Sequence, residues 1–385
     1  IYVCTDSGRE GEYIYRLVEQ QAQVHGKNRR RVWIDSQTEE EILRGIREAK
    51  DLSEYDNLAS AAYLRAKEDY LMGINFSRLL TLKYGNSISN YLGTDYAVVS
   101  VGRVMTCVLG MVVRREREIR EFIETPFYRI LATIGEQGQT FEGEWRAVKG
   151  SRWFESFDLY KENGFKDREE AEKMCARLSP EAPAVVHSVE RKKEKKNPPL
   201  LFNLAELQNI CSKLFKISPD QTLQITQELY EKKLVTYPRT DARVLSTAIA
   251  GEIDKNIRGL MNYPVASVYA KGILEAQSYK GIEKTNYVND KQITDHYAII
   301  PTGQGFGALP SMSELGQKVY EVIVRRFLAI FYPAAVYQRT ALTVCSGEPA
   351  EYFFTSVRLL VEPGFLPVSK YSFVTGKPKK DDKDK

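Results

Sequence analysis

The spacing of hydrophobic residues changes several times along the chain, and these changes limit the folds open to it more than any other feature. Residues 127–149 and 183–190 alternate apolar and polar side chains, as half-buried strands do. Residues 335–361 return to this alternation after a long helical stretch that begins near Asn197. We therefore expect a β-rich module that is interrupted by a helical insert and resumes after it.

The stretch before this module predicts a short strand followed by helices. Residues 1–5 (IYVCT) are typical of a buried strand, and the pattern from Glu10 to about Gln23 is helical. Residues 38–122 are mostly helical, with Thr38 and the acids after it as a capping box. Ligands of parallel α/β sheets bind at the carboxyl ends of the strands, and the acids lie at this end. The pattern therefore predicts a ligand site there.

Two further helices and a strand are predicted inside the insert. Apolar residues from Leu204 recur at helical spacing, and Ser218 with Gln221 makes a capping box for a second helix. The segment LVTYPRTD, residues 234–241, then predicts a strand. Two helices, a short turn and a strand resemble a winged helix–turn–helix unit.

Composition excludes several classes of protein. The 385 residues are 43% hydrophobic and 28% charged, which is ordinary for a soluble globular chain and excludes a disordered one. No apolar run reaches the roughly 18 residues of a membrane helix. The five cysteines are scattered without a Cys-x-x-Cys pair, which argues against a zinc ribbon and a disulfide framework and fits a reducing cytoplasm. The absence of a Walker A loop speaks against ATP use.

The net charge of +4 is too small to identify a partner, but basic residues cluster. Residues 114–120 read RREREIR and residues 191–196 read RKKEKK. Such runs are usually solvated faces, and they are also what phosphate binding requires. For residues 191–196 we favour the interpretation that the run is a solvated flank of a hinge over a specific phosphate site.

Acids gather in the segment DSGREGE, residues 6–12. Asp6 at a strand end and Glu10 on the next helix offer the hard oxygen ligands that Mg²⁺ prefers. The alternative is a helix-capping cluster with solvated glutamates.

Tyr237 and Arg239 lie two residues apart, which places them on one face of the predicted strand. A phenol beside a guanidinium suits attack on a phosphodiester, because arginine pairs with phosphate oxygens and keeps its charge. Two weaker signals accompany them. His296 sits in a short segment closed by Pro301, and Arg103 follows a glycine at a predicted helix start.

Five collinear blocks of this sequence resemble those of the type IA DNA topoisomerases, most closely the topoisomerase III branch. They are CTDSGREGEYI, AYLRAKEDYLMGINFSRLLT, SVGRVMTCVLGMVVRREREIREF, TLQITQELYEKKLVTYPRTD and DHYAIIPT. The sequence departs from the family at Gly8, where a second aspartate is common, and at Met105 and Cys107, where glutamine and proline are common.

The resemblance implies a multidomain α+β fold, the type IA toroid. A partial Toprim domain would cover 1–34 and a helical DNA-groove domain 35–122. A β-rich arch would cover 123–196 and 334–376. A helical, winged-helix-like domain carrying the active-site tyrosine would cover 197–333, and 377–385 would be a disordered tail.

The resemblance also implies an ATP-independent isomerase that cuts one DNA strand, passes another and reseals the cut. Tyr237 would form a 5′-phosphotyrosyl bond, with Arg239 and His296 as the other catalytic residues. Asp6 and Glu10 would bind Mg²⁺. The residues implied in DNA binding are Arg9, Arg65, Asp69, Arg78, Ser100 and Arg103.

The implied partners are single-stranded DNA and negatively supercoiled or catenated DNA, with a helicase as a candidate protein partner. Neither a membrane nor a small-molecule substrate is implied, and the protein would be cytoplasmic and bacterial. The family's catalytic glutamate maps before Ile1, so we expect the 385 residues by themselves not to relax DNA. Two alternatives remain: a non-catalytic relic that binds single-stranded DNA, and another Toprim enzyme such as a primase or nuclease.

Overall fold

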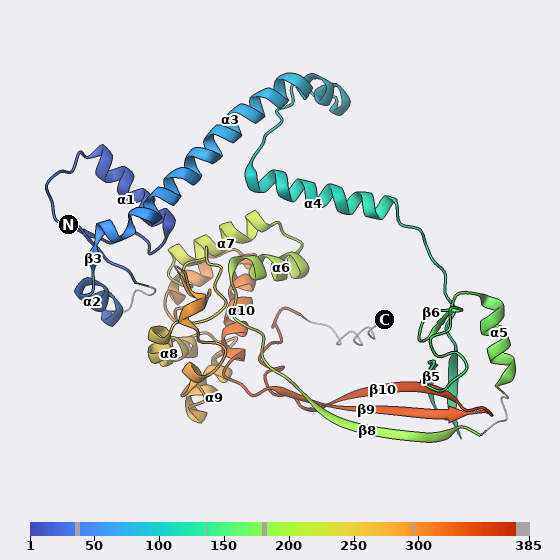
Figure 1. Ribbon diagram of the computed structural model, residues 1–385. Helices are drawn as coiled ribbons and strands as arrows, with labels where there is room; N and C mark the ends of the chain where they lie inside the picture. Colours follow the sequence, from blue (N-terminus) through green and yellow to red (C-terminus); the bar gives the residue numbers. More distant parts are fainter. Residues whose placement is uncertain (35–38, 137, 179–182, 295, 375–385) are drawn as a thin grey trace. The chain divides into compact units, whose positions relative to one another are not determined.

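The computed structural model describes residues 1–34, 39–136, 138–178, 183–294 and 296–374. The chain divides into two compact units (Figure 1). The first unit consists of residues 1–121, 199–332 and 368 onward, and the second of residues 122–198 and 333–367. The four-domain division stays a prediction. The expected cap at Thr38 and the expected tail 377–385 lie outside the described residues.

The first unit opens with a small sheet and a helix. Strand β1 (Tyr2–Val3) runs parallel to β2 (Arg30–Arg31), which pairs with β3 (Lys50–Asp51) in the antiparallel direction. Helix α1 (Arg9–Gln21) follows β1, and α2 (Glu39–Arg47) follows β2. The predicted strand, turn and helix are confirmed, and the parallel pairing places the acidic segment at the carboxyl end of β1.

Two long helices follow a short 3₁₀ helix at Leu52–Tyr55. Helix α3 covers Asp56–Leu92 and ends at Gly93, whose positive φ of 66° allows its N–H to bond the Ser89 carbonyl. Helix α4 covers Arg103–Arg120, so the prediction that this stretch is mostly helical is confirmed. Among the described residues, no helix is both long and apolar enough to cross a membrane.

The rest of the first unit is a helical bundle with a buried centre. Its helices are α6 (Leu204–Phe215), α7 (Pro219–Glu231), α8 (Thr247–Gly259), α9 (Ser267–Ala276) and α10 (Glu314–Ala329). Short 3₁₀ helices cover Leu260–Asn262, Ile282–Lys284, Asp290–Gln292 and Phe306–Ser311. The capping box of Ser218 and Gln221 is present at the start of α7, as predicted. Helix α10 is buried over most of its length, so it forms the core of the bundle.

The strand predicted over 234–241 is wrong. The segment is an irregular loop in which Val235 alone makes a bridge, to Pro301. Pro238 lacks a backbone N–H and therefore cannot continue a ladder. The argument that Tyr237 and Arg239 share one face of a strand fails with it.

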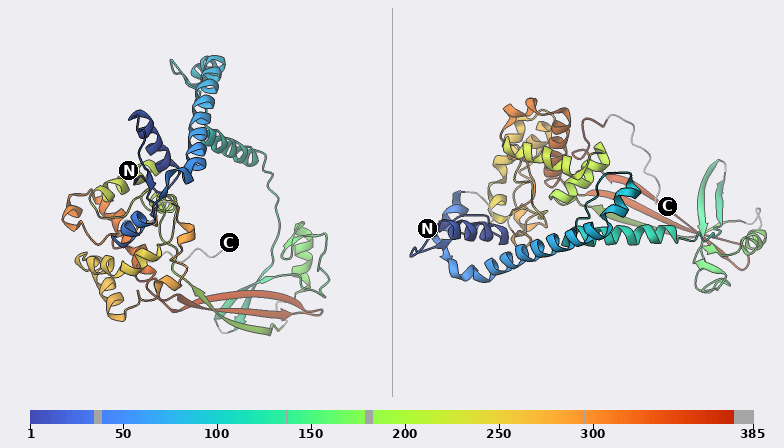
Figure 2. Two further views of the ribbon diagram at one scale, coloured as in Figure 1. Left: turned by 60° about the vertical axis from the view of Figure 1, so that its left-hand side comes forward. Right: turned by 90° about the horizontal axis from the view of Figure 1, so that it is seen from above.

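The second unit is built on one five-stranded antiparallel sheet (Figure 2). Its strands are β4 (Leu131–Glu136), β5 (Gln139–Trp145), β8 (Val185–Lys196), β9 (Ala335–Ser346) and β10 (Glu351–Glu362), in the spatial order β4-β5-β10-β9-β8. The sheet thus takes strands from both sides of the helical insert. The run 191–196 belongs to its edge strand β8.

The core of the second unit lies at one end of this sheet. A hairpin of β6 (Leu159–Lys161) and β7 (Gly164–Phe165) and helix α5 (Arg168–Arg177) pack there. The rings of Trp145 and Trp153 both lie 5.1 Å from that of Phe165, and Met174 is fully buried with them. Strand β8 is exposed over most of its length, which leaves its charges accessible.

Candidate active site

A pocket of about 370 Å³ opens in the first unit. Its lining comes from four stretches of the chain: Cys4, Thr5, Asp6 and Ser7; Ile34; Tyr230, Lys233, Val235, Thr236 and Tyr237; and His296, Tyr297 and Thr302. The pocket therefore brings together three residues singled out from the sequence, Asp6, Tyr237 and His296. Glu10 and Arg239 are not among its lining residues.

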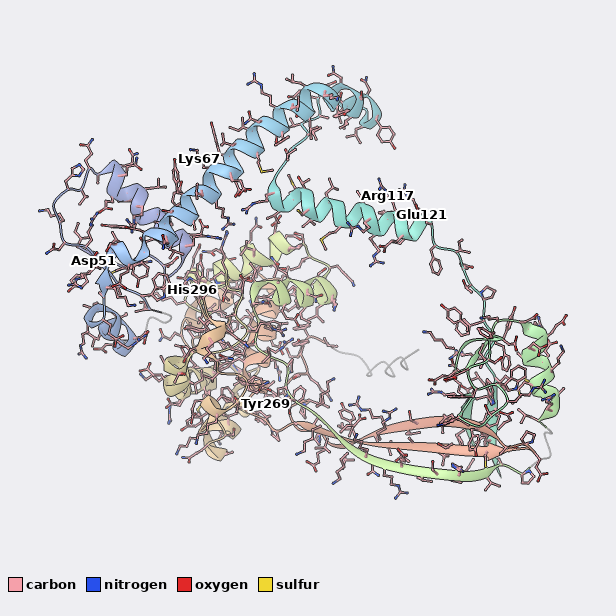
Figure 3. All side chains as sticks on the ribbon, viewed as in Figure 1. Asp51, Lys67, Arg117, Glu121, Tyr269 and His296 are labelled. Atoms are coloured by element: carbon pink, nitrogen blue, oxygen red, sulfur yellow. The ribbon has the colours of Figure 1, made fainter. Side chains whose placement is uncertain are left out.

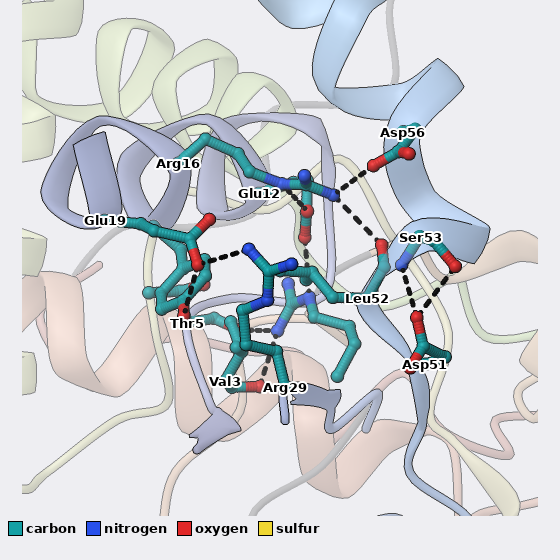
Figure 4. Close-up of polar contacts among 12 residues, drawn as sticks. Val3, Thr5, Glu12, Arg16, Glu19, Arg29, Asp51, Leu52, Ser53 and Asp56 are labelled. Carbon is teal, nitrogen blue, oxygen red and sulfur yellow. Dashed lines mark hydrogen bonds and ion pairs between the residues drawn. The ribbon is translucent and has the colours of Figure 1, made fainter. Parts of the chain in front are cut away.

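The backbone of the acidic turn is held by a buried arginine. Arg31 donates to the carbonyls of Val3 and Thr5, at 3.1 and 2.7 Å, and to that of Asp6 at 2.5 Å. Its charge is balanced by Glu12, whose carboxylate lies 2.9 Å from the Arg31 Nε. Both side chains are completely buried, and Arg16 binds the same carboxylate (Figure 4). Asp6 thus sits on a rigid turn.

Gly11 allows α1 to pack against this turn. A Cβ atom at Gly11 would lie 2.1 Å from the Asp6 carbonyl oxygen, closer than any contact between such atoms. The Asp6 carbonyl also accepts a hydrogen bond from the Gly8 N–H, at 2.8 Å. Gly11 therefore serves close packing of backbone on backbone.

Tyr237 is placed by hydrogen bonds between two loops. The Thr236 N–H donates to the Ile300 carbonyl at 3.0 Å, and the Thr236 hydroxyl both donates to the Ala298 carbonyl and accepts from the Ile300 N–H. The Thr240 hydroxyl donates to the His296 carbonyl at 2.7 Å. Residues on both sides of Tyr237 are thus tied to the segment that carries His296 (labelled in Figure 3).

The Tyr237 phenol and the His296 imidazole are neighbours. Their ring centroids lie 4.5 Å apart, and the Tyr230 ring is 5.4 Å from that of Tyr237. Tyr237 is half-buried, which fixes its ring and leaves a side open to the pocket. Burial raises the pKa of the neighbouring Tyr297 to about 12, so its phenol is held neutral.

Arg239 is exposed and lies outside the pocket lining. The loop turns at Pro238, where the Thr240 N–H bonds the Pro238 carbonyl at 3.1 Å. Any contact of Arg239 with a phosphate therefore involves substrate that extends beyond the pocket.

The two carboxylates expected to bind Mg²⁺ do not form a ligand set by themselves. The Glu10 carboxylate lies 2.9 Å from the Arg65 guanidinium and 3.7 Å from that of Arg9. No group of three or more His, Cys, Asp or Glu side chains suited to a metal occurs in the described residues. The donors do not fit Mg²⁺ in this arrangement, so we assign no step of the chemistry to a metal.

The sequence profile of the DNA topoisomerase family matches residues 53–384. The chain belongs to the type IA DNA topoisomerase family. It is 35% identical to DNA topoisomerase 3 of Bacillus subtilis, over 88% of this chain and 42% of that protein. It is 32% identical to DNA topoisomerase 3 of Bacillus licheniformis, over 100% of this chain and 48% of that protein.

A solved structure shows the same fold. Full-length topoisomerase I from Thermotoga maritima superposes with a TM-score of 0.61 at 22% identity, over 97% of this chain and 56% of that one. The chain spans about half the length of the topoisomerases that it matches. The sequence profile shows the family, and this structure shows the mixed α and β fold.

Three of the residues that family resemblance assigned to DNA binding form an ion-pair chain in this topoisomerase fold. Asp69 on α3 pairs with Arg103 on α4 through two contacts of 3.0 and 3.2 Å, and with Arg65 at 4.0 Å. Arg65 in turn reaches Glu10 on α1. The chain links three helices, so a phosphate that binds these arginines competes with carboxylates.

Two of the other predicted DNA-binding residues lie apart from this chain of ion pairs, and the third, Arg9, joins its end at Glu10. Arg78 on α3 and Ser100 before α4 are both exposed. Arg9 contacts Glu10 at 3.7 Å. Their roles in DNA binding stay predictions.

Sequence reasoning missed several topoisomerase residues at the pocket. Lys233 lines it with a left-handed backbone, φ 61°, which is unusual for a residue other than glycine. Its carbonyl accepts a hydrogen bond from the Thr302 hydroxyl at 2.5 Å. The letters YEKKLV simply continue a helical pattern, so nothing in them signals this turn. Tyr230 is one more residue of that helical pattern, so the sequence does not indicate that it lines the pocket.

Proposed function

We propose that this protein is an ATP-independent topoisomerase that cuts and reseals one strand of DNA through Tyr237. The observation that carries the proposal is the half-buried Tyr237 in a pocket shared with His296 and Asp6. Family membership supports the same assignment. The division into a partial Toprim domain, a groove domain, an arch and a tyrosine domain, together forming a toroid, is part of this proposal.

The reaction is a transesterification. The Tyr237 hydroxyl oxygen bonds to a backbone phosphorus as the bond from phosphorus to the 3′-oxygen breaks, and the phenolic proton ends on the 3′-oxygen. The products are a 5′-phosphotyrosyl end and a free 3′-hydroxyl. Resealing reverses both changes, so the phosphodiester energy is kept and no ATP is used.

The surrounding residues have separate roles in this proposal. His296, whose ring lies beside that of Tyr237, orients the phenol and takes part in proton movement. Arg239 holds a phosphate oxygen of the strand beyond the pocket. Asp6, which lines the same pocket, accepts a hydrogen bond from the 3′-hydroxyl once cleavage has formed it and so holds it for resealing. The substrates are single strands in negatively supercoiled or catenated DNA, and a helicase that exposes such strands is the proposed protein partner.

The proposal is tested by trapping the covalent intermediate. The full-length protein is mixed with a single-stranded oligonucleotide labelled at its 3′ end, and the reaction is stopped with denaturant. We expect label to migrate with the protein, because the 5′-phosphotyrosyl fragment retains the 3′ end. If the protein carried label only when the oligonucleotide was labelled at its 5′ end, the proposed polarity would be contradicted.

We also predict that affinity for single-stranded DNA falls steeply with salt. Each neutralised phosphate of a single strand contributes about 0.7 to the slope of log affinity against log salt, so about four contacts mean a loss of roughly 50-fold between 50 and 200 mM. Fluorescence anisotropy of a labelled oligonucleotide measures this slope. An affinity that stays constant with salt would refute backbone binding.

A further inference from the structure

The edge strand of the second unit carries an unusual concentration of positive charge. Strand β8 ends in Arg191, Lys192, Lys193, Glu194, Lys195 and Lys196, and all but Glu194 are exposed. These six residues are paired to β9 in regular register, from Arg191 opposite Thr340 to Lys196 opposite Ala335. The register therefore fixes which of the charges share a face of the sheet.

The face that contains Glu194 has its own counter-charge. Lys192 lies opposite Arg339, which lies opposite Arg358, so three cations cross the sheet in one row. The Glu194 carboxylate is 3.8 Å from Arg339 and 3.2 Å from Arg358. This acid partly neutralises the row.

The opposite face of β8 is different. Side chains alternate along a strand, so Arg191, Lys193 and Lys195 all project away from the Glu194 face. Their partners on β9 are uncharged: Thr340, Gln338 and Val336. The next partners on β10, opposite Thr340 and Gln338, are the apolar Val357 and Leu359.

One acid, Glu362, stands in the last of these three rows, but on the far strand. It lies opposite Val336 after a shift in register, two strands away from Lys195. Two strand spacings are about 9.6 Å, which is beyond the distance of an ion pair. Glu362 therefore offsets the charge of Lys195 only weakly.

Three like charges thus stand in a column on this face, and within the described part of the chain none of the three has an ion-pair partner. Alternate residues of a strand lie about 6.6–6.8 Å apart, so the column extends for roughly 13 Å. Like charges in a column repel one another. An extended anion with charges at short, regular intervals would offset that repulsion.

We propose that Arg191, Lys193 and Lys195 bind the phosphate backbone of DNA, as a contact surface additional to the Tyr237 pocket. The proposal rests on the proposed function in one respect, that DNA is the substrate. Duplex DNA carries one charge per roughly 1.7 Å of axis, so a 13 Å column faces several phosphates. Lysines bind phosphates as point charges without reading bases, so this surface is independent of sequence.

Cations on an edge strand can serve two further purposes, and each predicts its own experimental outcome. Lysines there hinder strand-to-strand aggregation. An acidic peptide lying across this face of the sheet would contact the same cations together with the exposed Val357 and Leu359 of β10. DNA is favoured because the family acts on it and because the column is regular and exposed.

The test compares two double variants of the full-length protein with the same loss of charge on the same strand. Lys193→Gln with Lys195→Gln removes two cations from the proposed surface. Lys192→Gln with Lys196→Gln removes two from the other face and is the matched control. Anisotropy with labelled duplex and single-stranded DNA is measured over a salt series, and circular dichroism confirms that both variants fold.

We expect the first variant to lose roughly tenfold in duplex affinity at low salt and to lower the salt slope by about 1 for each lysine, with little change in the control. Covalent cleavage of a short oligonucleotide should be unchanged in both variants. This cleavage assay therefore tests the Tyr237 assignment independently of the proposed β8 surface. Equal slopes in the two variants would overturn the proposal. The proposal would also be overturned if the first variant bound DNA as before but aggregated more. It would likewise be overturned if that variant bound DNA as before but lost binding to a labelled polyglutamate probe.

Discussion

Replacing Tyr237 by phenylalanine should abolish the covalent protein–DNA adduct. The change removes one oxygen and keeps the ring that packs against Tyr230 and His296. Without that oxygen the proposed nucleophile is missing, and loss of a nucleophile costs on the order of 10³-fold or more. The adduct is measured by denaturing gel with 3′-labelled oligonucleotide. Binding of single-stranded DNA should stay within a few-fold of the unmodified protein.

Tyr230→Phe is the matched control, because it removes a hydroxyl from the lining of the same pocket. We expect adduct formation to persist in this variant. If Tyr237→Phe still forms the adduct while Tyr230→Phe does not, the nucleophile has been misassigned. Unchanged thermal unfolding of both variants shows that the comparison concerns chemistry and not folding.

Hydrophobic spacing predicted the long elements well, because a helix or strand that buries one face must repeat its apolar residues. The pair α6 and α7 follows from such repeats, and the capping box at Ser218 was visible in the sequence. Helices α3 and α4 carry similar repeats, although α4 buries none of its residues. The segment around Tyr237 was predicted wrongly for a physical reason. Val235 and its neighbours have the composition of a strand, but Pro238 and the Thr236 hydroxyl redirect the backbone bonds to the 296–302 segment.

The site itself was only partly predictable from the sequence. The residue types of Asp6, Tyr237 and His296 indicated phosphoryl chemistry, and the structure places all three at one pocket. Their approach depends on pairings between segments far apart in the chain, such as Thr236 with Ile300, which no local pattern encodes. The buried partner of the acidic turn, Arg31, is the last of three consecutive arginines, a composition typical of a solvated surface.

Glu12→Ala should destabilise the amino-terminal part of the first unit by about 3–5 kcal/mol. Glu12 and Arg31 are both fully buried, so the variant would leave the Arg31 charge unpaired out of water, which is the costly way to break a buried pair. Arg31 also holds the carbonyls of Val3, Thr5 and Asp6, and its displacement would free the acidic turn. Hydrogen exchange read by mass spectrometry should show lost protection in the described residues of 1–55.

Glu54→Ala is the control for this prediction, because Glu54 pairs with Lys50 at 3.6 Å in the same region with both side chains more than half exposed. Exposed pairs contribute about 0–1 kcal/mol, so protection should hardly change. Glu12→Gln keeps a hydrogen-bond acceptor for Arg31, so its loss of protection should lie between those of Glu12→Ala and Glu54→Ala. Residues 199–332, which have their own buried core around α10, should keep their protection in all three variants. Equal exchange in Glu12→Ala and Glu54→Ala would show that the buried pair does not stabilise the turn, and Asp6 would then need another support.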